Sequence, residues 1–469
     1  MLSIILLSLF GIALLFLGFL KSKVLLLPAA LLFLAASAVA AFTDWNQSYL
    51  YFQGMLMTDN LAIIFTSIVL LSAFMVVALS GSWAEDESAQ PAEYYAILLF
   101  SLVGAVMMIS FENLIMLFVG VEILSVAMYV LTGSDKRNQR SNEAALKYFL
   151  MGAFATGILL FGMALLYGAT GSFTLGGLRG YLSAGNFTST VLLFRVGMLM
   201  LLIGMLFKVS AAPFHFWTPD VYDGAPTLFT AYMSTVVKTA GFAALLKLLS
   251  ASFAGLYDYW AIIIAIITTL TLIAGNVTAV YQNTFKRMMA YSSISHAGYL
   301  LIALVALTQE SKQAIVFYSL AYSLATISAF GVLLAVGKQR LATDVGSTLN
   351  TNETFDDFNG LARQNPLLGF VMAVSMLSLA GIPLTAGFWG KFMVFSAAAD
   401  RGVIWLLVVA VLMSAVGIYY YFRVIIAMYF RNGITRQVVI APFYRYVLIA
   451  ATILTIVLGL APGLVRGIL

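Results

Sequence analysis

The chain has 469 residues, of which 62% are hydrophobic and 9% charged, and it carries a formal net charge of +5. Soluble domains carry roughly 25% charged residues, so this composition excludes a soluble fold and makes lipid the solvent for most of the surface. The basic residues are scattered over short loops, which excludes nucleic acid as a partner. This distribution fits the excess of lysine and arginine that cytoplasmic loops of membrane proteins carry. With no cysteine, the chain cannot hold thiolate-bound iron–sulfur clusters or disulfides.

The apolar segments predict an all-α polytopic membrane bundle. Only helices and closed barrels satisfy their backbone groups in lipid, and stretches of about twenty residues without alternation indicate helices. The first segment has no basic residue before it and is too long for a signal peptide, so we expect it to be a retained helix. The expected helices, about 14 in all, are 2–20, 24–42, 60–80, 94–109, 112–131, 145–167, 191–217, 226–250, 259–281, 288–307, 313–337, 366–399, 402–430 and 444–463.

Two of these segments, the seventh at 191–217 and the twelfth at 366–399, are too long for one straight span. Each has an interior proline, Pro213 or Pro383. Proline removes a backbone donor and clashes with the carbonyl four residues earlier, so we expect both helices to be broken. The carbonyls set free would be those of Val209 and Leu379.

The spacing of the two broken helices predicts an inverted repeat. They are offset by five positions in the order of helices, an odd number, so equivalent helices would cross the membrane in opposite directions. Interrupted helices at matching places in two inverted halves are typical of transporters and mark the transport pathway. We therefore expect a single membrane domain, 1–469, with a first repeat at 94–250 and a second at 259–430.

Lysine and arginine counts predict the orientation. The loops after odd-numbered helices hold most of these residues, so we expect that side to be cytoplasmic and both termini to be external, in the cell's inner membrane. The residues on the cytoplasmic side are Lys21, Lys23, Lys136, Arg137, Arg140, Lys147, Lys286, Arg287, Lys338, Arg340, Arg363, Arg431, Arg436 and Arg445. Those on the other side are Arg179, Arg195, Lys247, Lys312, Arg401 and Arg466.

Four charged residues are expected deep in the membrane: Glu122, Lys208, Lys238 and Lys391. Each costs about 2.5–3.5 kcal/mol at the bilayer centre, so they should face the bundle interior. Buried lysines and glutamates can approach neutrality and exchange protons, whereas arginine stays charged. The set predicts a proton relay. Structural pairing or snorkelling remains the alternative for any single lysine of this set. Lys247 lies near the end of its helix, where we expect it to snorkel to the membrane interface.

A polar stripe on the tenth helix is the next candidate. Ser292, Ser295, His296 and Tyr299 share one helix face by their spacing. His296 is either a further relay group or a hydrogen-bonded core residue. The only other histidine is far away in the sequence and no carboxylate cluster accompanies either one, so no metal site is expected.

Two loop regions have less specific meanings. The polar stretch 338–365 is either a solvated linker between the two halves or a docking surface for a partner subunit. The glycines between Gly171 and Gly180 follow a helix and not a strand, which excludes a phosphate-binding loop.

Several of these segments resemble the antiporter-like subunits of respiratory complex I (NADH–quinone oxidoreductase) and of Mrp-type sodium/proton antiporters. They are FKVSAAPFHFWTPDVYDGAPT at 207–227, KYFLMGAFATGILLFGMALLYGATGS at 147–172, AYSSISHAGYL at 290–300 and GLARQNP at 360–366. The wording PDVY followed by GAP at 219–226 is similar to the N-type branch, and so is the length, since L-type subunits carry a long C-terminal lateral helix.

The resemblance implies fourteen helices with inverted five-helix repeats, of which the seventh and twelfth are broken. It implies that Glu122 and Lys208 form a coupling pair, that Lys238 is the central proton carrier and that Lys391 connects to the external side. His296 would belong to the hydrated axis between them.

It also implies a proton-translocating subunit that works beside other membrane subunits of complex I. NADH, flavin and quinone sites would belong to those other subunits, so no cofactor is expected on this chain. Two alternatives stay open: an Mrp-type cation/proton antiporter subunit, and a scaffold that braces a membrane arm without pumping.

Overall fold

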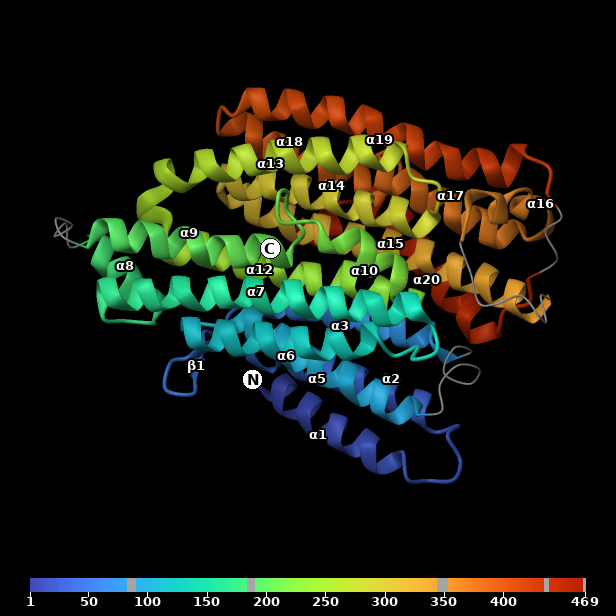
Figure 1. Cartoon of the computed structure of the whole chain (residues 1–469), viewed down its shortest axis with the longest axis horizontal. Helices are drawn as coiled ribbons and strands as arrows, with labels where there is room; N and C mark the ends of the chain where they lie inside the picture. Colours follow the sequence, from blue (N-terminus) through green and yellow to red (C-terminus); the bar gives the residue numbers. More distant parts are fainter. Residues whose placement is uncertain (82–89, 184–189, 344–352, 434–437, 467–469) are drawn as a thin grey trace.

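The computed structural model describes residues 1–81, 90–183, 190–343, 353–433 and 438–466. Its helices run side by side in one elongated bundle, with the early helices α1, α2, α5 and α6 on one side and α13 and α19 on the other (Figure 1). Within the described residues, 12 helices are long and apolar enough to cross a membrane, and Leu2–Leu17 and Pro366–Ala380 are shorter apolar helices. The predicted all-α membrane bundle is therefore confirmed.

The first half of the chain contains the helices before the first break and α10, the short helix that follows it. They are α1 (Leu2–Leu17), α2 (Leu26–Ala41), η1 (Phe42–Asp44), α3 (Asn60–Ala78), α5 (Pro91–Ser110), α6 (Leu114–Thr132), α7 (Gln139–Thr170), α8 (Leu175–Ser183), α9 (Val191–Lys208) and α10 (Trp217–Gly224). A short antiparallel hairpin that the sequence did not predict, β1 (Tyr49–Tyr51) with β2 (Leu56–Thr58), lies between α2 and α3.

The second part begins with one long helical stretch and contains the second break. Its elements are α11 (Thr227–Tyr232), η2 (Met233–Val237), α12 (Lys238–Lys247), η3 (Leu248–Ser252), η4 (Ala254–Leu256), α13 (Tyr257–Val280), α14 (Phe285–Ala306), α15 (Gln309–Thr343), η5 (Phe355–Phe358), α16 (Leu361–Gln364), α17 (Pro366–Ala380), α18 (Ala386–Asp400), α19 (Ile404–Phe430), α20 (Pro442–Leu460) and α21 (Gly463–Arg466).

Helix α7 begins at Gln139, six residues before the predicted start at 145. The reason is a cap: the Asn138 side chain accepts a hydrogen bond from the Arg140 backbone N–H at 3.0 Å, which satisfies a donor that a helix start leaves unpaired. At the other end, Gly171 adopts a left-handed conformation with φ 69°. The other glycines of this run lie in or beside α8, so the run is a helix end and a short helix, as expected for a sequence that is not a phosphate loop.

The predicted break near Pro213 is present, but it lies earlier and is wider than expected. α9 ends at Lys208 and α10 starts at Trp217. Lys208, expected mid-way along the seventh predicted segment, is therefore the last residue before the break. The segment between them is tied down by side chains: the Trp217 indole N–H donates to the Phe207 carbonyl at 3.1 Å, and the Ala212 N–H donates to Thr271 Oγ1 at 2.9 Å.

The break near Pro383 separates α17 from α18 and begins with Gly381, whose φ is 83°. We expected the carbonyl of Leu379 to be set free there. The neighbouring carbonyl, that of Ala380, accepts a side-chain hydrogen bond from Lys391 Nζ at 2.9 Å.

Close approach of glycines holds the helices together. A Cβ atom on Gly104 of α5 would lie 2.6 Å from the Gly120 carbonyl of α6, and one on Gly162 of α7 would lie 2.7 Å from the Gly197 carbonyl of α9. Small residues at such contacts are the usual packing device of membrane helices, because lipid supplies no hydrophobic drive to associate.

Candidate proton-relay site

The three predicted membrane lysines are buried in the bundle. The exposed fractions are 5% for Lys208, 3% for Lys238 and 6% for Lys391, whereas Glu122 of α6 is half-buried. A buried ammonium without a partner would be very costly, so the partners of each lysine define its chemistry.

Lys208 Nζ donates a hydrogen bond to Ser125 Oγ of α6 at 2.7 Å. Ser125 lies three residues after Glu122, on the same side of the helix. Among the ion pairs formed by the described residues, none joins Glu122 to Lys208 directly, but the two charges still interact electrostatically. In this structure, a serine hydroxyl therefore holds the ammonium next to the carboxylate.

Lys238 is the first residue of α12 and directly follows the π-helical turn η2. π-turns often occur where a helix serves a functional site. Lys238 Nζ donates to both the carbonyl and the hydroxyl of Ser293 on α14. The ring of Tyr322 from α15 lies on another side, with its centroid 6.0 Å from Nζ.

The Lys391 side chain of α18 extends back to the break between α17 and α18. Its Nζ donates to the Ala380 carbonyl at 2.9 Å and to Ser414 Oγ of α19 at 3.0 Å. It also lies over the ring of Tyr299 from α14, 4.7 Å from the centroid. The break thus supplies a carbonyl that an unbroken helix would keep for itself.

Helix α14 connects the surroundings of Lys238 with those of Lys391. Ser293 contacts the first lysine and Tyr299 the second, and six residues of α-helix separate them by about 9 Å along the axis. His296 lies midway between them. The predicted stripe on this helix therefore faces the protein interior, and Ser292, Ser295, His296 and Tyr299 are all buried.

Both ring nitrogens of His296 are hydrogen-bonded to tyrosines of neighbouring helices. Nδ1 lies 2.7 Å from the Tyr318 hydroxyl of α15, and Nε2 lies 3.0 Å from the Tyr421 hydroxyl of α19. Tyr421 also contacts the Ser292 hydroxyl at 2.5 Å. A cavity of about 10 Å³ beside His296, reaching Ser378 at the end of α17, has room for one water molecule.

Lys208 ends α9 and Lys238 begins α12, and the contact between these two segments is apolar. A Cβ atom on Gly241 of α12 would lie 2.7 Å from Val209 Cγ1, directly after Lys208. These two elements therefore pack tightly, and any proton that crosses here needs water to enter between them.

Lys247 lies at the end of α12, where we predicted that it would snorkel towards the membrane interface. Its side chain is paired with Glu112, at 3.2 Å between Nζ and Oε2, and is 14% exposed. This pairing was not predictable, because Glu112 lies in the connection between α5 and α6, far from Lys247 in the chain.

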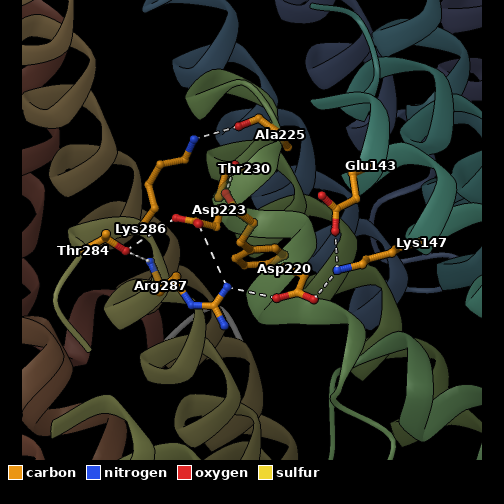
Figure 2. A network of polar contacts seen from close by, with 10 residues as sticks. Glu143, Lys147, Asp220, Asp223, Ala225, Thr230, Thr284, Lys286 and Arg287 are labelled. Carbon is orange, nitrogen blue, oxygen red and sulfur yellow. Dashed lines mark hydrogen bonds and ion pairs between the residues drawn. The ribbon is translucent and has the colours of Figure 1, made fainter. Parts of the chain in front are cut away.

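A second polar cluster, which we term the Asp220 junction, joins α7, α10 and α14. Asp220 accepts hydrogen bonds from Lys147 Nζ at 2.7 Å and from Arg287 Nη1 at 2.9 Å, and Lys147 also pairs with Glu143 at 2.7 Å. Figure 2 shows Asp220 between the two cations, with Asp223 beside Arg287. The junction lines an open cavity of about 240 Å³.

The polar stretch 338–365 lies partly outside the described residues, at 344–352. From Glu353 onward it packs on the start of α14: the Phe285 N–H donates to the Glu353 carbonyl at 2.9 Å. Burial raises the pKa of the Glu353 carboxyl, whose Oε1 accepts from Thr227 Oγ1 at 3.4 Å. This described part is therefore anchored to the bundle.

Sequence reasoning found the lysines and His296 but missed their partners. Ser125, Ser293, Ser414, Tyr318 and Tyr421 carry no individual signal in a membrane helix, because hydroxyls there commonly bond their own backbone. Within the described residues, no group of three or more histidines or carboxylates could hold a metal ion, and the chain has no cysteine.

The comparisons with known proteins agree with this architecture. Residues 111–418 match the family model described as NADH:quinone oxidoreductase/Mrp antiporter, transmembrane. NADH-quinone oxidoreductase subunit N of Trichlorobacter lovleyi is 42% identical over 99% of this chain and 93% of its own. The subunit N of Cytophaga hutchinsonii is 39% identical over 99% of both chains.

Solved structures show the same fold. A chain of respiratory complex I from Thermus thermophilus, solved with bound aureothin, has a TM-score of 0.83 and 36% identity, covering 99% of this chain and 98% of that one. A chain of the Mrp complex from Dietzia has a TM-score of 0.86 over 99% of this chain and 95% of that one, at 19% identity; this likeness shows the fold alone.

A polytopic bundle with two broken helices and buried lysines at its centre defines an antiporter-like membrane protein. Family model and relatives together make the assignment more specific. The chain belongs to the subunit N family of NADH-quinone oxidoreductases.

Proposed function

We propose that this chain translocates protons as a membrane subunit of a redox-driven NADH–quinone oxidoreductase. The observation that carries the proposal is the shared environment of three buried lysines. Each donates to a serine hydroxyl from a different helix: Lys208 to Ser125, Lys238 to Ser293 and Lys391 to Ser414.

A serine hydroxyl suits a lysine that changes its protonation state. A hydroxyl accepts a hydrogen bond from the ammonium and, after rotating, donates one to the neutral amine, whereas a carboxylate can only accept. The lysine therefore keeps a partner in both states. A fixed structural ion pair would favour a carboxylate partner, as Lys247 has in Glu112.

The proposed route runs from Glu122 and Lys208 through Lys238 and His296 to Lys391. A charge that appears or disappears at a distance of about 7 Å, at an effective dielectric of about 20, changes the energy of its neighbour by about 2 kcal/mol. A change at Glu122 would in this way load or unload the next lysine. His296 lies on α14 between the partners of Lys238 and Lys391. The transfer from Lys208 to Lys238 needs water, because Val209 and Gly241 are in tight contact between them.

The proposal includes fourteen membrane helices in all, with two inverted five-helix repeats at 94–250 and 259–430. Matching local features support it. Asn113 caps α6 and bridges to Thr174, and Thr284 caps α14 and bridges to Thr354. The next backbone N–H in each case, of Leu114 or Phe285, donates to the neighbouring strand-like segment at 2.9 Å.

In this arrangement the chain lies in the inner membrane with both termini external and works beside other membrane subunits of complex I. NADH, flavin and quinone are handled by those subunits, and no cofactor is assigned to this chain. An Mrp-type antiporter is the weaker alternative, because the likeness to that complex is at 19% identity. A scaffold that does not pump would have no reason to bury three lysines.

The test is Lys238→Ala in the assembled complex. We expect the proton-to-electron ratio in proteoliposomes to fall, because the central carrier is lost, while the subunits still co-purify. Lys312→Ala, at the start of α15 and outside the row, is the matched control and should pump as wild type. An assembled Lys238→Ala complex that pumps at the wild-type ratio would contradict the proposal.

A further inference from the structure

We propose that the Asp220 junction and the outer face of α7 together bind one phospholipid whose zwitterionic headgroup carries a primary ammonium, as phosphoethanolamine does. The inference goes beyond proton transfer and does not depend on it. It starts from the open cavity of about 240 Å³ that the junction lines. A single water molecule needs only about 10–15 Å³, so the cavity has room for a much larger polar group.

The charges that line this cavity are balanced. There are three cations and three carboxylates: Arg140, Lys147 and Arg287, and Glu143, Asp220 and Asp223. A basic pocket at the end of membrane helices recognises an anionic lipid headgroup. A lining with equal numbers of both charges instead matches a headgroup that carries both, so the site favours a zwitterion over an anion.

Cationic groups of the junction can receive the phosphate. Among the described residues, Arg287 contacts the carboxylates of Asp220 and Asp223 through one nitrogen, Nη1 (Figure 2). A guanidinium has five N–H donors in a planar fork that suits phosphate oxygens, and most of them are on its other two nitrogens. The exposed Arg140 side chain lines the same cavity and adds a second guanidinium.

The ammonium of the headgroup has an accessible partner in Glu143. This carboxylate pairs with Lys147 through Oε1, and its side chain is 63% exposed. A primary ammonium has three N–H donors, whereas the trimethylammonium of a choline headgroup has none, and a carboxylate is only an acceptor. The site should therefore distinguish ethanolamine from choline, although both headgroups are zwitterionic.

The outer face of α7 supplies a surface for the acyl chains. Four residues of this helix share one face by their spacing: Glu143, Lys147, Leu150 and Phe154. Leu150 and Phe154 are 57% and 73% exposed. The face is thus charged beside the cavity and apolar beyond it, in the same order as the headgroup and the acyl chains of a phospholipid.

A junction that only ties α7, α10 and α14 together makes a different prediction. Its ion pairs would hold the three helices with water in the cavity, and lipids of every headgroup would cover α7 equally. A bound phosphoethanolamine lipid would instead enrich one headgroup at this helix and not at other lipid-facing helices.

The experiment uses the purified, assembled complex in nanodiscs of phosphatidylethanolamine, phosphatidylcholine and phosphatidylglycerol in equal parts. In three parallel samples, one lipid at a time carries a photoactivatable diazirine on its acyl chain. After illumination, mass spectrometry measures labelling of the α7 peptide relative to the lipid-facing helix α13. We expect the ethanolamine probe to label α7 about threefold or more above the choline and glycerol probes, a preference that one or two exposed charge pairs supply.

Three substitutions place the preference at the cavity. Arg140→Gln and Glu143→Gln remove one partner of the phosphate and one of the ammonium, and both side chains are exposed, so the core of the bundle is unchanged. We expect each to bring the three probes to equal labelling. Glu310→Gln removes an exposed carboxylate at the start of α15, away from the cavity, and should keep the preference of the wild type.

Three outcomes would overturn the proposal. Equal labelling of α7 by all probes in the wild type means that only unselective lipid covers this face. A preference for the glycerol probe means that the site recognises an anionic headgroup. An ethanolamine preference that persists in both Arg140→Gln and Glu143→Gln places the selectivity outside the Asp220 junction. None of these outcomes bears on proton pumping, which the Lys238→Ala measurement tests separately.

Discussion

At the scale of single residues, the choice of lysine over arginine carries the functional argument. Lys208 contacts Ser125 and interacts with the charge of Glu122. Arginine would keep the positive charge but would not release a proton at working pH. We expect Lys208→Arg to lower turnover and pumping by about tenfold or more, equivalent to a barrier increase of at least about 1.4 kcal/mol.

The control for this substitution is Lys247→Arg. Lys247 is paired with Glu112, and a guanidinium can replace the ammonium in a fixed pair. NADH-driven quinone reduction and proton uptake, measured on equal amounts of assembled complex, compare the two. Wild-type turnover in Lys208→Arg would mean that Lys208 serves as a fixed charge.

The residue scale also shows what a sequence can and cannot reveal. A charge inside an apolar helix is conspicuous because it is expensive, so Glu122, Lys208, Lys238 and Lys391 were predictable. Ser293 was not, although it is the partner of Lys238. It lies beside the stripe of Ser292, Ser295 and His296, and which face of a helix meets a given lysine depends on packing between helices far apart in the chain.

At the scale of elements, the two proline breaks were predictable and their boundaries were not. Proline fixes where a helix cannot continue, but Gly381 and the ties of Trp217 and Ala212 decide where it stops. The π-turn before Lys238 has no sequence signal, since it contains ordinary helix formers and β-branched residues.

The Asp220 junction yields a prediction for the element α10. Asp220→Asn removes one partner each from Lys147 and Arg287, which link α10 to α7 and α14. All three side chains are about one-third exposed, so each pair is worth about 0.2–1 kcal/mol. We expect a lower thermal unfolding temperature in detergent, with a difference from wild type that shrinks as salt screens the charges.

Glu143→Gln is the matched control for Asp220→Asn. It removes only the pair between Glu143 and Lys147 within α7, a helical contact worth about 0.3–0.5 kcal/mol, and it leaves α10 tied to both neighbours. The two variants are compared by scanning fluorimetry at low and high sodium chloride. An Asp220→Asn loss no larger than that of Glu143→Gln, or one that does not respond to salt, would show that the junction does not stabilise α10.

At the scale of the whole molecule, the proposed row of carriers crosses both halves of the chain. Glu122 lies on α6 in the first half and Lys391 on α18 in the second, with Lys238 and His296 connected along α14 between them. The sequence predicted which helices carry charges, but their convergence on α14 comes from tertiary packing. A proton that must cross a hydrocarbon core of about 30 Å needs several stops.

This arrangement predicts how two distant substitutions combine. If Glu122 and Lys391 act in series, Glu122→Gln and Lys391→Ala should each remove most of the pumping by this subunit, and the double variant should be no worse than the more severe single one. Substitutions at distant, independent sites usually add in free energy, whereas members of one functional unit do not. The measurement is the proton-to-electron ratio of the two single variants and the double variant, normalised to assembled complex and set beside Lys312→Ala. Losses that add, with each single variant keeping a separate part of the pumping, would indicate two independent routes and would contradict a single row through α14.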